Sequence, residues 1–509
     1  MRTGIASLML CTASLGLALI ASAGRAPAAE VDVALTAQRA TATMTDGAKV
    51  PMWGYCVSSA TPASAAVGAA CAAAAAWTPG PTLYAAPGDT LVVTLSNQLP
   101  VATSFVILGQ FGGGLGAPVR DPQGPIVHPA VTTTTWPVKT GGSFTPPTQG
   151  TRVRSFVPEA AAMGTTPGSQ IYTYAGLKPG TYLYETGTHP SLQAPMGLYG
   201  VLVVTTSPAV TVAAGATPAS IATPGTAYPA GAINGVSVPA VNYDADAIFL
   251  ISEVDAAQNA AVDAAAVAGT NDRTAWNAPG CTTVGGTTPC YPPAVNYAPT
   301  YILLNGQSFD RNNPSGNAAE VPPLYATGNL MVRIVNAGLR THVPSIVGLP
   351  MSLIADDGNR APGAPKVQSE ALMTAGKTRD VLVTPAPAAT TAASPAAYAE
   401  AAYAFFDRSL GLSTNGAPFG GAQGYLAVVN PATVAAAGSL TASQAFNAWL
   451  GGAAGKAVTV TAHAVADGFT MPAYAKTYSG NVLINDVGVY AAAVAVAPAS
   501  GTVAMNADG

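Results

Sequence analysis

The sequence predicts an all-β protein made of two β-sandwiches, followed by a shorter β-rich segment. Short runs rich in Val, Ile, Tyr and Thr recur along the chain, and turn-forming Gly, Pro, Asn and Asp separate them. Examples are TLYAAPGDTLVVTLSN, GLYGVLVVTT, AIFLISEV and NLMVRIVNAG. Only VDAAQNAAVDAAAVAG, near residues 254–269, is expected to be helical, and it lies between the two sandwiches. Many short strands with regular turn signals are typical of β-sandwiches.

The first 29 residues predict a secretory signal peptide. Arg2 precedes an apolar stretch, IASLMLCTASLGLALIASA, which ends in small residues. No later segment reaches the roughly 18 uninterrupted apolar residues that a membrane-spanning helix needs. We therefore expect a mature protein that is secreted, periplasmic or at the cell surface, with no transmembrane segment after cleavage.

The composition bears on the partners of the protein. Charged residues make up 9% of its 509 residues, and the formal net charge is -4. No Lys/Arg run is available to neutralise a phosphate backbone, so nucleic acid is not an expected partner. A weakly charged surface repels its neighbours weakly, which is compatible with dense packing in a surface layer. An Ala-rich sequence from a high-GC genome explains the same composition equally well.

The cysteines form two local pairs. Cys11 leaves with the signal peptide, and four cysteines remain in an oxidising compartment. Disulfides are expected between Cys56 and Cys71 and between Cys281 and Cys290, and thiolate metal ligands are the alternative. The first pair closes a loop of about 15 residues and should contribute on the order of 3 kcal/mol.

Composition shifts divide the chain into segments. A Pro/Ala/Thr-rich stretch after about residue 206 marks a linker between the two sandwiches. The expected segments are the signal peptide (1–29), domain one (30–206), the linker (207–239), domain two (240–432), an Ala-rich uncertain segment (433–470) and a partial repeat (471–509).

Two resemblances to known families go further. The blocks PGDTLVVTLSNQLPVATS, GLKPGTYLYETGTHPSLQAPMGLYGVLVV, LLNGQSF, VRIVNAGLRTH, LIADDG and TRDVLV resemble multicopper oxidases in content and order over residues 80–430. This resemblance implies two cupredoxin-like Greek-key β-sandwiches. Near the C-terminus, VLIND and GTVAMNADG resemble the opening of bacterial cadherin-like or Ig-like repeats, which implies a natural product longer than this sequence.

The copper chemistry of that family needs more donors than this chain has. Multicopper oxidases hold three coppers with eight imidazoles in four His-x-His pairs, and a fourth copper with Cys, two His and usually Met. This chain has four histidines, His128, His189, His342 and His463. None of the remaining cysteines has a His within ten residues, which also removes the blue-copper centre. Copper nitrite reductases are excluded on the same count.

The lost ligand positions can be read residue by residue. Where the family reads T-S-x-H-W-H-G, residues 103–109 read TSFVILG, so Val106 and Leu108 occupy ligand positions. Where it reads T-H-P-x-H-L-H-G-H, residues 341–349 keep His342 alone, and the lost positions are Ser345, Val347 and Leu349. Asp407-Arg408-Ser409 stands where the blue-copper His-Cys-His would fall.

Aliphatic residues suit a sandwich that has lost its copper. An unpaired buried imidazole costs about 1–3 kcal/mol, whereas a buried Val or Leu contributes roughly 1.5–3 kcal/mol. We therefore expect Val106, Leu108, Val347 and Leu349 to be buried in a dry contact between the two domains. We also expect that no catalytic residue or cofactor is present and that the chain is not a working oxidase; any activity would be of the multicopper-oxidase type.

Two features leave a functional and a structural interpretation open. His189 and Met196 could form a weak copper site, since imidazole and thioether both bind copper; a lone His in a turn beside a core Met explains them as well. Asp356 and Asp357 are adjacent, so on a strand they would point to opposite faces, and a turn is the simpler interpretation.

Three functions remain in view. The first is a non-catalytic structural, assembly or adhesion module, whose partners are other surface or extracellular proteins or further copies of itself. The second is a copper-binding or redox protein with a reduced site at His189 and Met196. The third is a carbohydrate or small-ligand module that uses tyrosines, with strand packing as the alternative role of these side chains. The tyrosines are Tyr172, Tyr174, Tyr182, Tyr184 and Tyr199.

Overall fold

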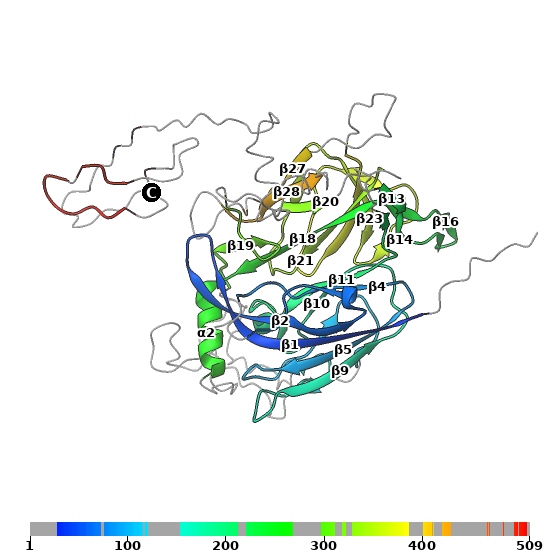
Figure 1. The fold of residues 1–509 in the computed structure, drawn as a ribbon, viewed down its shortest axis with the longest axis horizontal. Coiled ribbons are helices and arrows are strands. Elements are labelled where there is room, and N and C mark those ends of the chain that lie inside the picture. The colour runs from blue at the N-terminus through cyan, green and yellow to red at the C-terminus, as the bar shows by residue number, and fades with distance from the viewer. Residues whose placement is uncertain are drawn as a thin grey trace, which may run out of the picture.

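The computed structural model confirms the all-β prediction (Figure 1). It describes residues 28–72, 76–115, 118–120, 153–211, 220–267, 297–310, 318–321, 328–385, 401–409, 411, 420–428, 466, 468, 482, 493–496 and 498–505. The expected signal peptide up to residue 27, Cys281, Cys290 and most of the partial repeat lie outside these residues. Within them, no helix is long and apolar enough to cross a membrane.

The first sandwich consists of two mixed sheets. One has the order β2 (Lys49–Thr61), β1 (Glu30–Thr43), β5 (Thr90–Asn97) and β9 (Gly168–Tyr174). The other has the order β3 (Ala66–Val67), β4 (Thr82–Ala85), β11 (Tyr199–Val204), β10 (Gly180–Glu185) and β6 (Val106–Ile107). The short elements beside them are a 3-10 turn (Ala63–Ala65), the pair β7 (Val119–Arg120) and β8 (Val153–Ser155), and α1 (Pro190–Gln193).

Alternation of side chains explains why these strands form. In β5 every second residue is buried, and Leu91, Val93 and Leu95 have no exposed surface. This is the period-two pattern of a strand with one face on a core.

The five tyrosines considered for ligand binding are also at most 2% exposed, so their role is strand packing.

Six short strands, within residues 209–211 and 220–243, form three two-stranded sheets in the part of the sequence between the sandwiches. The pairs are β12 (Ala209–Thr211) with β13 (Ser220–Thr223), β14 (Gly225–Tyr228) with β17 (Val241–Tyr243), and β15 (Gly231–Ile233) with β16 (Val236–Val238). The last pair turns through Asn234 and Gly235, which both have positive φ angles (49° and 80°). Asn-Gly is the preferred sequence for such a hairpin turn.

The second sandwich repeats the architecture of the first. Its larger sheet runs β19 (Tyr301–Leu304), β18 (Ala245–Val254), β21 (Leu330–Asn336), β26 (Thr378–Val383), β23 (Met351–Asp356) and β24 (Asn359–Arg360), and β25 (Lys366–Gln368) also pairs with β23. Its smaller sheet runs β20 (Ala318–Val321), β28 (Gln423–Val428), β27 (Ala401–Asp407) and β22 (Pro344–Ile346). The turn predicted at Asp356 and Asp357 is present at Asp357 and Gly358, with φ angles of 49° and 69°, whereas Asp356 is the last residue of β23.

The two sandwiches share a hydrophobic cluster. Side chains of β2, β10 and β11 pack there against those of β18, β19 and β21, and Trp77, Leu183, Tyr199 and Leu250 are among its members. In Figure 1, β10 and β11 accordingly lie between the outer strands of the first sandwich and the larger sheet of the second. Because this contact is apolar and continuous, the sandwiches form one packed unit.

A buried arginine reinforces this junction. Arg333 of β21 has no exposed surface, and its Nε donates to Asp246 Oδ2 over 2.8 Å. Its Nη1 donates to Thr181 Oγ1 of the first sandwich over 3.0 Å. Asp380 lies 3.7 Å away and accepts hydrogen bonds from Thr181 and Tyr228. Burial lowers the pKa of Arg333, but the two carboxylates raise it above its ordinary value, so the side chain remains charged.

The predicted helix is α2 (Ala256–Val267), and it packs on the first sandwich although it follows a strand of the second (Figure 1). Val262 and Ala265 join the core of the first sandwich. Asp263 accepts hydrogen bonds from Arg39 Nε (2.8 Å) and from Trp53 Nε1 (3.0 Å). The helix thus makes a second contact between the two sandwiches.

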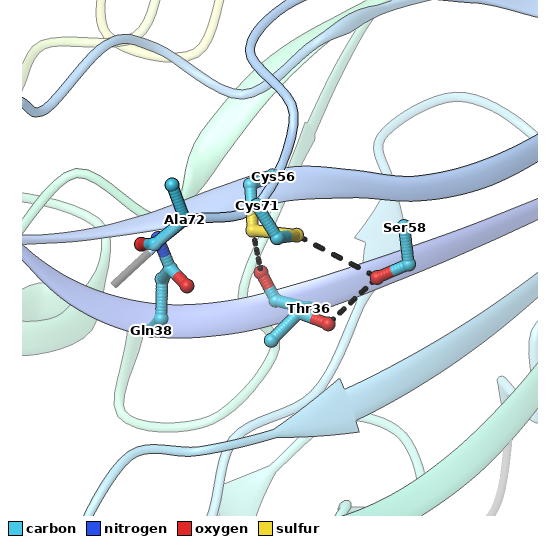
Figure 2. The surroundings of a disulfide bond; sticks show 6 residues. All are labelled: Thr36, Gln38, Cys56, Ser58, Cys71 and Ala72. Carbon is cyan, nitrogen blue, oxygen red and sulfur yellow. Dashed lines mark hydrogen bonds between the residues drawn. A yellow bond between two sulfur atoms is a disulfide. The ribbon is translucent and has the colours of Figure 1, made fainter. Parts of the chain in front are cut away.

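The predicted disulfide between Cys56 and Cys71 is present (Figure 2). The two Cα atoms are 5.0 Å apart, within the normal range for a disulfide. The bond joins β2 to the segment after β3, beside Thr36 of β1 and Ser58 of β2.

Candidate functional site

Val106 and Leu108, the first two positions predicted from the sequence as lost ligands, lie on β6 and in the turn after it. Val106 pairs with Glu185 of β10 and is 5% exposed in the core of the first sandwich. Leu108 is 38% exposed, so the prediction that it is buried was wrong. The reason is local: β6 ends at Ile107, and Gly109, with a φ of 91°, turns the chain away.

Leu108 instead lines a cavity of about 400 Å³ between the two sandwiches. Leu183 of β10 contributes apolar surface, and Asp357, Lys377 and Thr378 line the side of the second sandwich. Lys377 Nζ and the Thr378 amide donate to the two carboxylate oxygens of Asp357, over 2.8 and 2.9 Å. The residues that line this cavity include no His, Cys or Met, so they do not supply the soft donors that copper prefers.

The second set of positions predicted as lost ligands follows the same pattern. Ser345 lies on β22, is 8% exposed and donates its hydroxyl to the Ser369 carbonyl over 2.7 Å. Leu349 is 5% exposed in the core of the second sandwich. Val347 is 53% exposed, so the prediction of burial was wrong here too. As at Leu108, the strand has just ended, and Gly348 with a φ of 83° turns the chain.

The expected dry interface of four aliphatic side chains is therefore not formed. Val106 belongs to the core of the first sandwich and Leu349 to the core of the second. The contact between the sandwiches is instead made by the cluster around Trp77, Leu183 and Leu250. Val106 and Leu349 thus stabilise two separate cores.

His342 is held between two carboxylates. Its Nδ1 lies 2.8 Å from Asp407 Oδ2, and its Nε2 lies 2.8 Å from Glu253 Oε1. All three residues are at most 2% exposed. Asp407 also accepts hydrogen bonds from the Val343 amide (2.7 Å) and the Ser409 hydroxyl (2.6 Å).

The electrostatics of this group favour an imidazolium. Burial lowers the pKa of His342, but hydrogen bonds to Asp407 and Glu253 outweigh it and raise the pKa to about 9. Burial raises the pKa of Asp407, but the bonds from His342, Ser409 and Val343 lower it to about 2. With both ring nitrogens protonated and bonded, His342 has no lone pair for a metal.

His189 directly precedes α1, and Met196 follows it by three residues. His189 is partly buried, has a φ of 41°, and its carbonyl accepts hydrogen bonds from the Leu192 and Gln193 amides (2.8 and 2.9 Å). Met196 has no exposed surface and packs in the core of the first sandwich. This placement agrees with the structural interpretation, a His in a turn and a core Met. A copper site at this pair stays a prediction.

The sequence interpretation missed the partners of His342 and the role of Arg333. The signal that could have pointed to them is a single charge within an apolar strand, as Glu253 is in AIFLISEV and Arg333 in LMVRIVN. Buried charges are found only where they are paired. Among the residues that the structure describes, no group of three or more His, Cys, Asp or Glu is arranged to hold a metal ion.

Comparison with known proteins gives similarity of architecture only. No family model and no curated protein matches the chain. A blue copper oxidase from Nitrosomonas europaea is 13% identical, with a TM-score of 0.41, over 78% of this chain and 85% of that one. The copper nitrite reductase of the same organism is 14% identical, with a TM-score of 0.42, over 79% and 94%. Botrytis aclada laccase is 18% identical, with a TM-score of 0.42, over 79% and 53%. These identities and TM-scores are too low to transfer any chemistry to this chain, so its chemistry has to be inferred from its own residues.

Proposed function

We propose that this chain is a non-catalytic, cupredoxin-like protein that is exported and has a structural, assembly or adhesion role at or outside the cell surface. The observation that carries this proposal is the state of His342, the one histidine retained at a ligand position, whose two ring nitrogens are bonded to Asp407 and Glu253. A copper ion there would have to displace a buried ion pair.

The residues at the other predicted ligand positions and the described cysteines do not fit a redox centre either. Val106 and Leu349 are aliphatic and packed in cores, and Leu108 and Val347 are aliphatic on exposed turns. The described cysteines, Cys56 and Cys71, are joined in a disulfide and offer no thiolate. A copper centre for electron transfer needs a thiolate with imidazoles around it. We therefore assign no step of any reaction to these residues.

The surface supports a role in contacts with other molecules. Only 9% of the residues are charged, and several large apolar side chains are more than half exposed. These include Phe111 (72%), Phe156 (52%), Ile171 (59%), Val347 (53%) and Leu372 (52%). Low charge weakens repulsion between copies. We propose other surface or extracellular proteins, or further copies of this chain, as the partners.

A copper-binding or redox role is the second candidate, and one observation favours it. Of the two histidines that the structure describes, His189 is partly exposed whereas His342 is buried. The imidazole of His189 is therefore the one that a copper ion from solution could reach. Met196 would have to leave the core to join it.

Two measurements on the exported protein test the proposal. After incubation with copper, it should oxidise phenolic substrates no faster than free copper does. Its sedimentation should show concentration-dependent association, or immunodetection should place it with the cell envelope. Turnover above the copper control would overturn the non-catalytic assignment. A protein that stays monomeric and free in the medium would overturn the assembly role.

A further inference from the structure

The second sandwich is crossed by three buried ionisable side chains. Glu253 stands near the end of β18 in the larger sheet, and Asp407 ends β27 in the smaller sheet. His342 lies in the segment between β21 and β22 and contacts both carboxylates over 2.8 Å. The imidazole is therefore the bridge between the two sheets at this end of the sandwich.

The bridge needs two protons on one ring. An ionised carboxylate accepts hydrogen bonds and donates none, so each contact with His342 needs an N–H on the side of the imidazole. Asp407 already accepts from the Val343 and Ser409 amides, and Glu253 accepts from the Arg340 amide over 2.9 Å. Because the three residues are at most 2% exposed, water cannot take the place of a missing donor.

We propose that Glu253, His342 and Asp407 form a proton-dependent clasp, in which the charged imidazole joins the two sheets of the second sandwich and opens when its proton is lost. The clasp occupies the place where the family resemblance puts copper ligands: His342 is the retained histidine, and Asp407 begins the segment that replaces His-Cys-His. The protonated imidazole thus links the two sheets at the place where the resemblance would put a metal ion. This inference does not depend on the proposed role at the cell surface.

Other titratable groups face the clasp. Tyr297 and Tyr199 of β11 both lie near the Glu253 carboxylate. Burial raises the pKa of both phenols, so neither loses its proton before His342. Asp255 accepts from the Gln258 and Ala298 amides. Arg408, next to Asp407, is paired with Glu370 at 3.4 Å. His342 is thus the group of this cluster that changes charge between neutral and mildly alkaline pH.

The sign of the effect follows from linkage. The pKa of His342 is about 9 in the folded chain against an ordinary 6.5. The clasp is therefore complete below pH 6.5, and its contribution to stability is lost as the pH rises through about 9. Between these values the folded state holds one proton more than the unfolded state, so the folded-to-unfolded ratio should fall about tenfold per pH unit.

Denaturant unfolding of the full chain from pH 6 to 10 tests the clasp. Burial also raises the pKa of Glu185 in the first sandwich to about 7, so the clasp is measured as a difference between variants. Between pH 6.5 and 9, the folded-to-unfolded ratio of the wild type should fall about tenfold more per pH unit than that of His342→Gln. The matched control is His189→Gln, which changes the other described histidine and should keep the slope of the wild type. Equal slopes for His342→Gln and the wild type would overturn the proposal.

A second measurement needs no variant, which matters if His342→Gln does not fold. Nitrogen-15 NMR of the wild type, labelled in its four histidines, should show at pH 7.5 one imidazole with both ring nitrogens protonated. That signal should titrate near pH 9. Only neutral imidazoles at pH 7.5 would overturn the clasp.

Discussion

Replacing Val106 by His places an imidazole at a position predicted as a lost copper ligand, and we expect it to destabilise the protein. The Val106 side chain is 5% exposed within the core of the first sandwich. Overpacking a filled core costs about 1–3 kcal/mol. Burying a ring nitrogen without a partner costs about 1–3 kcal/mol more. Since the two costs overlap, we expect a loss of about 2–4 kcal/mol in the free energy of unfolding.

Val347→His is the matched control. It makes the same chemical change at another position predicted as a lost ligand, but the Val347 side chain is 53% exposed. A surface substitution of this kind should change the free energy of unfolding by less than about 0.5 kcal/mol. Urea unfolding of both variants, with and without one equivalent of copper, measures the difference. Equal stabilities, or a Val106→His variant that copper stabilises, would refute the reasoning about the lost site.

Three further changes probe the ties described above. Replacing Cys56 and Cys71 together by Ser should cost about 3 kcal/mol of unfolding free energy, and an unchanged denaturation midpoint would contradict this. Asp263→Ala leaves Arg39 and Trp53 without their acceptor on α2 and should cost about 1–3 kcal/mol; it should also speed proteolysis of the helix, and unchanged cleavage would count against the tie. Arg333→Met leaves the buried Asp380 and the partly buried Asp246 without their counter-charge and should cost about 3–5 kcal/mol. Retention of wild-type stability in a thermal scan would mean that Arg333 does not stabilise the junction.

Local patterns explain what the sequence could predict. The alternation in β5, the Ala-rich run of α2 and the short spacing of Cys56 and Cys71 depend on near neighbours, and all three are present. Leu108 and Val347 were predicted wrongly because the family motif says which residue replaces a ligand but not where a strand ends. Glycines with positive φ decide that, at Gly109 and Gly348.

The contacts of His342 with Asp407 and Glu253 could not be predicted from the sequence, for a different reason. Its two partners are 65 and 89 residues away in the sequence, and they meet only when both sheets of the second sandwich have formed. No local spacing encodes that meeting. Glu253 in an apolar strand shows only that a partner must exist.

Metal analysis of the purified, exported protein after copper loading and dialysis tests the central claim most directly. The account predicts less than one tightly bound copper per chain and no blue absorption band, because His342 is bonded to Asp407 and Glu253 and the described cysteines form a disulfide. One or more coppers per chain, with a blue band, would contradict it.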